Sequence, residues 1–243
     1  MRALLLAGGL GTRLRPLTDH TPKCLVDIAG RPLLYYWLDM LLKSGVERVL
    51  INTHWLSGQV FEFVSTSPWR EKIELVHERA LLGTGGTILK NQDFFKNQDF
   101  FVAHADNLAL FEVSDFINAH HNRPATCEMT MLAFETDDPS SCGILECDDR
   151  SIVWKFHEKV ENPPGNLANA AIYLFTPAIF RRLNALNSSF IDLSTEIIPD
   201  FLGKIFCVPT KGYIRDIGTI GHLERARRDI DDLNFMLNHQ FTR

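Results

Sequence analysis

Apolar runs and amphipathic segments alternate through the first half of the chain, and this pattern predicts strands and helices in turn. Four short, mostly apolar runs have the character of buried strands in a parallel sheet. The segments between them have helical spacing, and the first opens at Arg31-Pro32 and stops at Gly45. The expected strands are residues 3–7, 47–53, 73–78 and 99–106, and the expected helices are residues 33–45, a segment from about Ser57, a short helix after the GTGG segment through Leu89, and residues 112–121. We expect right-handed crossovers to wrap both faces of the sheet.

The second half of the chain has a different texture. It contains a long alternating strand at 125–135, a β-hairpin formed by 143–148 and 151–159, and a further strand at 168–175. Pro177 starts a helix, another helix is expected around residues 194–202, the segments 204–210 and 212–218 follow it, and a charged amphipathic helix begins at about Ile220. The pattern predicts an α/β class: a Rossmann-like, mostly parallel sheet with helices on both faces plus a small subdomain that contains the β-hairpin. No low-complexity linker divides the chain, so we expect one unit, 1–243, with parts 1–122, 123–218 and 219–243.

A glycine-rich loop follows the first strand. The apolar run from Ala3 stops at Gly8-Gly9, and Gly11 comes before Arg13, Arg15 and Lys23. Glycines allow a sharp turn and a close approach of backbone amides to phosphate oxygens, and the basic side chains suit a polyanion. The spacing is neither that of a dinucleotide-binding fingerprint nor that of a P-loop. On these residues alone, an ordinary strand-to-helix turn with solvated charges stays an open alternative.

Two carboxylates follow predicted strands far apart in the sequence, Asp106 after FFVAHA and Asp216 in YIRDIG. Ligands of such sheets bind beyond the carboxyl ends of the strands, where the glycine loop and Asp106 also fall. Mg²⁺ usually takes one or two carboxylates plus substrate phosphates. Each aspartate taken alone is as consistent with a solvated carboxylate at a strand end.

Composition narrows the class of protein. The chain has 243 residues, 45% hydrophobic and 23% charged, as a soluble globular protein has. A net charge of −5 argues against a nucleic-acid-binding surface. No apolar stretch approaches the ~20 residues of a membrane span, and the N-terminus leads directly into a strand rather than a signal peptide. The five scattered cysteines suit reduced thiols, so we expect a cytoplasmic protein with no nucleic-acid or membrane partner.

The stretch AGGLGTRLRPLTDHTPKCLVDIAGRPLL resembles the signature of the sugar-1-phosphate nucleotidyltransferases, the nucleotide-sugar pyrophosphorylases. Nearly every element of the signature is present, and one departure is Cys24, where the family commonly has proline after the lysine. The resemblance implies the nucleotide-diphospho-sugar transferase fold. It also implies a reaction in which a nucleoside triphosphate (NTP) and a sugar 1-phosphate give an NDP-sugar and pyrophosphate, by in-line attack without a covalent enzyme intermediate. The short members that act as mannose- or heptose-1-phosphate guanylyltransferases are the most similar.

The family's functional positions carry over to this sequence one by one. HADN and RDIGT match the segments that bind the metal jointly, which implies Mg²⁺ on Asp106 and Asp216, although Ala105 replaces a usual glycine. With Arg13 at the β- and γ-phosphates and Lys23 near the α-phosphate, these aspartates make up the expected catalytic set. Arg15 fits a structural ion pair equally well. The implied nucleotide-binding residues are Leu6, Ala7, Gly8, Gly9, Gly11, Thr12, Arg13, Lys23, Glu78, Gly83, Thr84 and Gly85.

The implied sugar-phosphate site lies mainly in the second half of the chain. The Glu158-Lys159 pair resembles the family's Glu-Lys-Pro segment, with Val160 in place of proline. Cys142 and Ala171 stand where the family usually has tyrosine and glycine, so the identity of the sugar does not carry over. The expected residues here are Asn107, Gly143, Glu158, Lys159 and Asn169.

Glu78 falls where the family reads the edge of the base. A carboxylate can accept from two donors of guanine but from only one on the pairing edge of uracil, which favours GTP. Uridylyl or thymidylyl transfer to a hexose or amino-sugar 1-phosphate remains an alternative, because relatives with a similar glutamate are uridylyltransferases. A non-catalytic nucleotide-sugar-binding regulator and a cytidylyltransferase of the same fold are less favoured. His54, His104 and His157 are interpreted as structural, and the state of association is open between monomer and homodimer.

Overall fold

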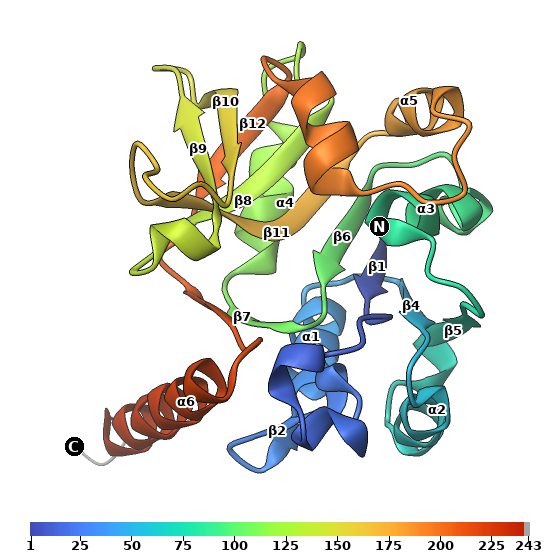
Figure 1. Ribbon diagram of the computed structural model, residues 1–243, viewed down its shortest axis with the longest axis vertical. Coiled ribbons are helices and arrows are strands. Elements are labelled where there is room, and N and C mark those ends of the chain that lie inside the picture. The colour runs from blue at the N-terminus through green and yellow to red at the C-terminus, as the bar shows by residue number, and fades with distance from the viewer. Residues whose placement is uncertain (241–243) are drawn as a thin grey trace.

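The computed structural model describes residues 1–240, with side chains described through residue 232. One nine-stranded sheet runs through the molecule in the order β5-β4-β1-β6-β11-β8-β12-β10-β9 (Figure 1). Its strands are β1 (Arg2–Leu6), β4 (Arg48–Thr53), β5 (Ile73–His77), β6 (Phe100–His104), β8 (Met129–Glu135), β9 (Gly143–Cys147), β10 (Ile152–Glu158), β11 (Leu167–Phe175) and β12 (Ile205–Pro209). Two small antiparallel ribbons stand apart from it, β2 (Asp27–Ile28) with β3 (Arg31–Pro32) and β7 (Asn107–Leu110) with β13 (Tyr213–Asp216).

The first four strands of the sheet, β5-β4-β1-β6, are parallel, as the sequence predicts. The sheet then becomes mixed, because β11 runs antiparallel to both β6 and β8, and the β9–β10 hairpin is added at the far edge. The predicted α/β class with helices on both faces is therefore confirmed, and the parallel part of the sheet belongs to the first half of the chain.

Two hydrophobic cores lie on opposite faces of the sheet, and the alternation along β1 divides its side chains between them. Ala3 and Leu5 belong to one core, and Leu4 and Leu6 to the other. Helices α1, α2 and α4 pack on the first face, and α3 and α5 on the second; α6 lies beside the β2 and β13 ribbons and adds Leu223, Ala226 and Ile230 to the first core (Figure 1). The helices are α1 (Leu33–Lys43), α2 (Ser57–Thr66), α3 (Gly83–Lys90), α4 (Val113–His121), α5 (Ile179–Ala185) and α6 (Ile220–Gln240). None of the helices within residues 1–240 combines the length and the apolar character needed to cross a membrane.

Some local expectations need correction. The GTGG segment was expected to precede a helix, but residues 83–86 form the first turn of α3. The helix expected around 194–202 is a π-helical turn (Leu193–Ile197) followed by a 3₁₀ turn (Ile198–Phe201). The side chain of Asp192 caps it by accepting from the amide of Thr195 at 3.0 Å. These two turns connect the segment after α5 to β12, and the cap satisfies one of the backbone amides at their start.

A buried histidine network ties α4 to the sheet. His120 is completely buried, with Nδ1 2.7 Å from the Thr130 hydroxyl and Nε2 3.0 Å from the Asp99 carboxylate. Burial lowers the pKa of His120, and the charge of Arg123 acts in the same direction although Asp99 opposes it. The neutral ring therefore donates from Nε2 to Asp99 and accepts at Nδ1 from Thr130.

This network predicts a loss of stability in mild acid. Because the pKa of His120 is lower in the folded than in the unfolded chain, where it is about 6.5, stability is full above that pH and falls as the pH drops below it. Between pH 7.5 and 5.5 the melting temperature should fall less for His120→Gln than for the wild type. The control His121→Gln changes an exposed neighbour on the same helix and should keep the wild-type slope. An unchanged slope in His120→Gln would contradict the assignment.

Candidate active site

The glycine loop, residues 7–11, follows the end of β1 and is held by the side chains of Asn52 and Thr18. The Asn52 carbonyl oxygen accepts from the amide of Ala7 at 2.8 Å, and the Thr18 hydroxyl donates to the carbonyl of Gly11 at 2.7 Å. A Cβ atom at Gly8 would lie 2.9 Å from Asn52 Nδ2, whereas one at Gly9 would meet nothing within 4 Å. The loop is therefore packed on one side and open on the other, as a backbone that binds a ligand must be.

The two aspartates predicted to act together do meet, and a lysine joins them. The β7–β13 ribbon pairs Asp216 with Asn107, which places Asp216 beside Asp106. The ammonium of Lys23 lies 3.0 Å from Asp106 Oδ2 and 3.2 Å from Asp216 Oδ1. Only 6% of the Lys23 side chain is exposed, so the ion pairs are shielded from solvent on the lysine side.

Arg13 approaches the same carboxylates from the solvent side. Its Nη2 is 3.5 Å from Asp216 Oδ2, and 67% of its side chain is exposed, so it is free to reach a ligand. Gly218 makes this contact possible, since a Cβ atom there would lie 2.6 Å from Arg13 Nη2 and 2.8 Å from Asp216 Oδ2. The amide of Gly218 also donates to Asp216 Oδ1 at 2.7 Å. The RDIGT motif therefore supplies a carboxylate and the space that this carboxylate and Arg13 need.

Charges around Asp106 keep it ionised. Burial raises the pKa of its carboxyl, but the charge of the neighbouring Lys23 ammonium and its hydrogen bond outweigh burial, and the result is a pKa below the ordinary range. Burial lowers the pKa of His104, against the pull of Asp106, so the imidazole is neutral at pH 7. Its Nε2 is buried and has no hydrogen-bond partner among the residues that the structure describes. The sequence predicts a structural role for His104. In the structure its Nε2 lies near Asp106 without a hydrogen-bond partner among the described side chains, which a purely structural histidine would not require.

Two Asp carboxylates with open oxygens fit a divalent cation. Hard cations take oxygen ligands, and Mg²⁺ commonly completes its shell with water and substrate phosphates. The Lys23 ammonium already lies at the point where the two carboxylates converge, which shows that the pair is arranged around positive charge. Within residues 1–232, whose side chains the structure describes, no group of three His, Cys, Asp or Glu side chains forms a complete metal site. A metal held here would therefore take its remaining ligands from water or from a substrate.

Glu78 is a buried carboxylate that is only half satisfied. Just 1% of the residue is exposed, and Oε1 accepts from the Thr87 hydroxyl at 2.6 Å. Oε2 is buried without a hydrogen-bond partner in the described part of the chain. A buried carboxylate oxygen that lacks a partner is costly, so this position favours a ligand with N–H donors.

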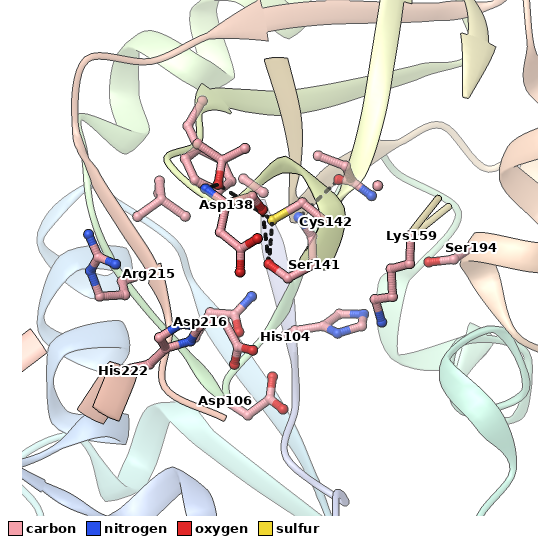
Figure 2. Close-up of a pocket in the computed structure, with 18 of the residues that line it drawn as sticks. His104, Asp106, Asp138, Ser141, Cys142, Lys159, Ser194, Arg215, Asp216 and His222 are labelled. Carbon is pink, nitrogen blue, oxygen red and sulfur yellow. Dashed lines mark hydrogen bonds between the residues drawn. The ribbon is translucent and has the colours of Figure 1, made fainter. Parts of the chain in front are cut away.

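Two cavities meet at His104 and Asp106. We call the first the glycine-loop cavity. The predicted site residues that line it are Leu6, Gly8, Gly9, Glu78, Gly83, Thr84 and Asp106. The second, the hairpin cavity, lies against the β9–β10 hairpin and contains Arg13, Asp106, Asn107, Gly143, Glu158, Lys159, Asn169 and Asp216. Figure 2 shows the hairpin cavity with His104 between the Asp106–Asp216 pair and Lys159. The remaining predicted residues, Ala7, Gly11, Thr12, Lys23 and Gly85, line neither cavity.

The wall of the hairpin cavity is preorganised. A Cβ atom at Gly143 would lie 2.5 Å from the Phe156 ring, so no side chain fits there. The amide group of Asn169 is fixed in orientation, because its oxygen accepts from the amide of Ala171 at 2.9 Å and its nitrogen donates to the Tyr173 hydroxyl at 2.8 Å. Ala171 has a φ of +56°, a left-handed conformation that favours glycine and explains why glycine is the usual residue there.

Several lining residues escaped sequence reasoning. In the hairpin cavity they are Asp138, Ser141, Ser194, Arg215 and His222 (Figure 2). Arg215 is the first residue of the RDIGT motif and His222 lies three residues after its end, and this closeness to Asp216 was the one signal that could have singled them out. In the glycine-loop cavity the additional residues include Phe190 and Asp192, which no motif marks.

The glycines of the second loop have a packing role that the sequence did not indicate. Gly83 has a φ of +75°, and a Cβ atom on it would lie 2.3 Å from the carbonyl oxygen of Ile191. The amide of Gly85 donates to this same oxygen at 2.8 Å. The loop therefore binds the chain around Ile191 on one side while Gly83 and Thr84 border the cavity.

A glycine loop at the edge of an α/β sheet, beside paired carboxylates and basic side chains, is typical of proteins that bind nucleotides. The model of the nucleotidyl transferase family matches residues 2–232, and the chain belongs to this family.

The chain is similar to the mannose-1-phosphate guanylyltransferase catalytic subunit beta of Danio rerio, with 33% identity over 227 residues that cover 90% of this chain and 61% of the relative. The subunit of the same name from Dictyostelium discoideum is 29% identical, with coverage of 90% and 61%. The chain thus spans about three fifths of the length of these curated relatives.

Solved structures agree on the architecture. HddC from Yersinia pseudotuberculosis, complexed with GMP-PN, superposes with a TM-score of 0.79 at 26% identity, over 94% of this chain and 99% of that chain. Apo UDP-glucose pyrophosphorylase superposes with a TM-score of 0.81 at 21% identity, over 96% and 98% of the two chains, and this likeness concerns the fold alone.

Proposed function

We propose that the protein transfers a nucleotidyl group from GTP to a mannose- or heptose-type sugar 1-phosphate and releases pyrophosphate. The observation that carries this proposal is the meeting of two cavities at Asp106, with Lys23, Arg13 and Asp216 gathered at the junction. A glycine loop and a half-satisfied glutamate suit a nucleotide on one side. A lysine–glutamate pair and a fixed asparagine amide suit a phosphorylated sugar on the other. The guanylyltransferase names of the similar proteins support guanine as the base and mannose as the sugar.

The reaction joins two anions, so charge neutralisation and alignment are the main tasks of the protein. Arg13, exposed at the rim of the site, is suited to the β- and γ-phosphates and the departing pyrophosphate. Lys23, held almost buried, is suited to the α-phosphate, where charge develops in the transition state. Asp106 and Asp216 would hold Mg²⁺, which neutralises phosphate charge when bound. Lys159 and Glu158 would then fix the sugar phosphate and the sugar hydroxyls.

Glu78 is proposed to select the base. Its carboxylate can accept from both N1–H and the amino group of guanine, whereas a glutamine amide offers one acceptor and places a donor against the other. We expect Glu78→Gln to raise KM for GTP at least tenfold and to lower the preference for GTP over UTP, with a smaller effect on kcat. Steady-state kinetics with both nucleotides measures this. The exposed Glu71→Gln is the matched control, and equal losses with every NTP would refute the selective role of Glu78.

Pyrophosphate release from five NTPs, each paired with several sugar 1-phosphates, tests the proposed function. We expect the highest kcat/KM with GTP and a mannose-type 1-phosphate. A clear preference for UTP or dTTP would favour the alternative uridylyl- or thymidylyltransferase. Binding of nucleotide sugars without turnover of any pair would favour the non-catalytic regulator.

Gly218 provides a test of the junction that leaves its charges in place. A methyl group there would push Arg13 or Asp216 from its position, and misplacement by about 1 Å can cost 10²-fold in rate. We expect Gly218→Ala to lower kcat between tenfold and a hundredfold, on the order of that principle, with little change in melting temperature. Gly221→Ala, where an added Cβ atom meets nothing within 4 Å, should behave as the wild type. Wild-type turnover by Gly218→Ala would show that the contact between Arg13 and Asp216 is dispensable.

A further inference from the structure

A segment after α5 crosses the start of α3 and is fixed there by the backbone. We call residues 187–193 the strap. The amide of Ile191 donates to the carbonyl of Leu82 at 2.9 Å, and its carbonyl accepts from the amide of Gly85 at 2.8 Å. The amide of Leu193 donates to the Thr84 hydroxyl at 2.8 Å. Since Ile191 is completely buried, the strap has a defined position over the edge of the glycine-loop cavity.

Phe190 is the one large hydrophobic residue of this strap that is exposed, at 52%. Its backbone is held by Ser188, whose hydroxyl donates to the carbonyl of Phe190 at 2.6 Å and lies 3.3 Å from its amide nitrogen. The side chain lines the glycine-loop cavity, as does Leu81, which is 39% exposed. The protein thus holds an uncovered aromatic ring at a cavity by means of a well-anchored backbone.

The other walls of this cavity indicate what covers the ring. Glu78 offers a buried acceptor oxygen without a partner among the side chains described, those of residues 1–232, which suits a planar group with N–H donors on its edge. Gly8 and Gly9 border the same cavity and offer an open loop to phosphate. A flat, donor-bearing ring connected to phosphates is a nucleobase. Stacking of a base on an aromatic side chain is favourable for every base, because each has a π-face.

We propose that Phe190 stacks on the nucleobase and supplies affinity for any base, while Glu78 selects among bases. This inference rests on the proposed function and adds a binding residue that belongs to neither glycine motif. The two residues would then contribute differently at one site. The stacking ring changes the affinity for all NTPs by a similar factor, and the carboxylate changes the affinity for one NTP relative to another.

The test uses GMP and ribose 5-phosphate, which differ in the presence of the base. Binding of GMP by isothermal titration calorimetry should weaken roughly tenfold in F190A, the order expected for loss of one base–aromatic contact. F190Y should stay within about twofold of the wild type because it keeps the ring. F61A, which removes a 65% exposed phenylalanine on α2, is the control and should bind GMP as the wild type does. F190L keeps an apolar side chain without a ring, so this variant should also bind GMP several-fold more weakly. It serves as the test variant if F190A does not fold.

Two further readouts distinguish stacking from a general defect. Tryptophan emission of F190W should be quenched by GMP but not by ribose 5-phosphate, relative to the wild type with its four tryptophans. In turnover, KM for GTP and for UTP should rise by the same factor in F190A, with KM for the sugar phosphate unchanged. Wild-type GMP affinity in both F190A and F190L would overturn the stacking role and leave the proposed function standing. A wild-type protein that binds no mononucleotide and releases no pyrophosphate would overturn both.

Discussion

Replacing Asp216 by asparagine should lower turnover about a thousandfold while the protein remains folded. The substitution keeps the shape of the side chain but removes the charge that would hold a cation beside Asp106 and Lys23. Metal stabilisation of charge in a transition state is worth several kcal/mol, and each 1.36 kcal/mol is a factor of ten in rate. Asp106→Asn should have an effect of the same size, because the two carboxylates flank one point.

The measurement is kcat for pyrophosphate release at saturating substrates, with circular dichroism and melting temperature as the check on folding. Asp39→Asn alters an exposed ion pair on α1 and should turn over normally. A rate for Asp216→Asn within threefold of the wild type would show that the pair does not act jointly. If excess Mg²⁺ fully restored the rate of Asp216→Asn, the loss would be one of cation affinity, which agrees with the proposed role of Asp216 in holding Mg²⁺.

Replacing Lys23 by methionine should have the second large effect, and it should appear both in rate and in stability. The buried ammonium bridges Asp106 and Asp216, so its removal leaves two like charges facing each other without their counter-charge. It also removes the proposed donor to the α-phosphate, and loss of one such donor costs about 10²–10³ in kcat. We therefore expect kcat to fall about a thousandfold and the melting temperature to fall without Mg²⁺.

Mg²⁺ should restore part of the lost melting temperature in Lys23→Met, and it should raise that temperature more than it does for the wild type. The reason is that a divalent cation would replace the ammonium between the carboxylates. Lys43→Met removes an exposed lysine that pairs with Asp39 and serves as the control. If Mg²⁺ failed to stabilise Lys23→Met at millimolar concentrations, the two carboxylates would not constitute the cation site.

Sequence reasoning was most successful where a local pattern decides the structure. The apolar run of β1 followed by Gly8 predicts a buried strand and a sharp turn because both features depend on neighbouring residues. The left-handed backbone at Gly45 and the end of α1 follow from the same kind of local rule. Family resemblance then supplied residues that no local rule could have found, such as Glu158 and Asn169, and the structure places them in one cavity.

The features that the sequence did not predict depend on distant pairs. The short strand at Asp216 is predicted from the sequence, but its partner β7 is not, and it is their pairing that brings Asp216 to Asp106. The docking of the strap on Gly83 is likewise a tertiary contact, visible only once Ile191 is placed beside it. Phe190 lies in a polar stretch without a motif. Its meaning comes from the cavity that it lines.

The most direct test of the proposed reaction follows the α-phosphorus of GTP. GTP labelled at this atom is incubated with Mg²⁺ and mannose 1-phosphate, and the products are separated and counted. The account predicts that the label appears in GDP-mannose, with one pyrophosphate released per labelled product, and that nothing is released when the sugar phosphate is left out. Label that stays in GTP, or appears only in GMP, with every sugar 1-phosphate tried would contradict it.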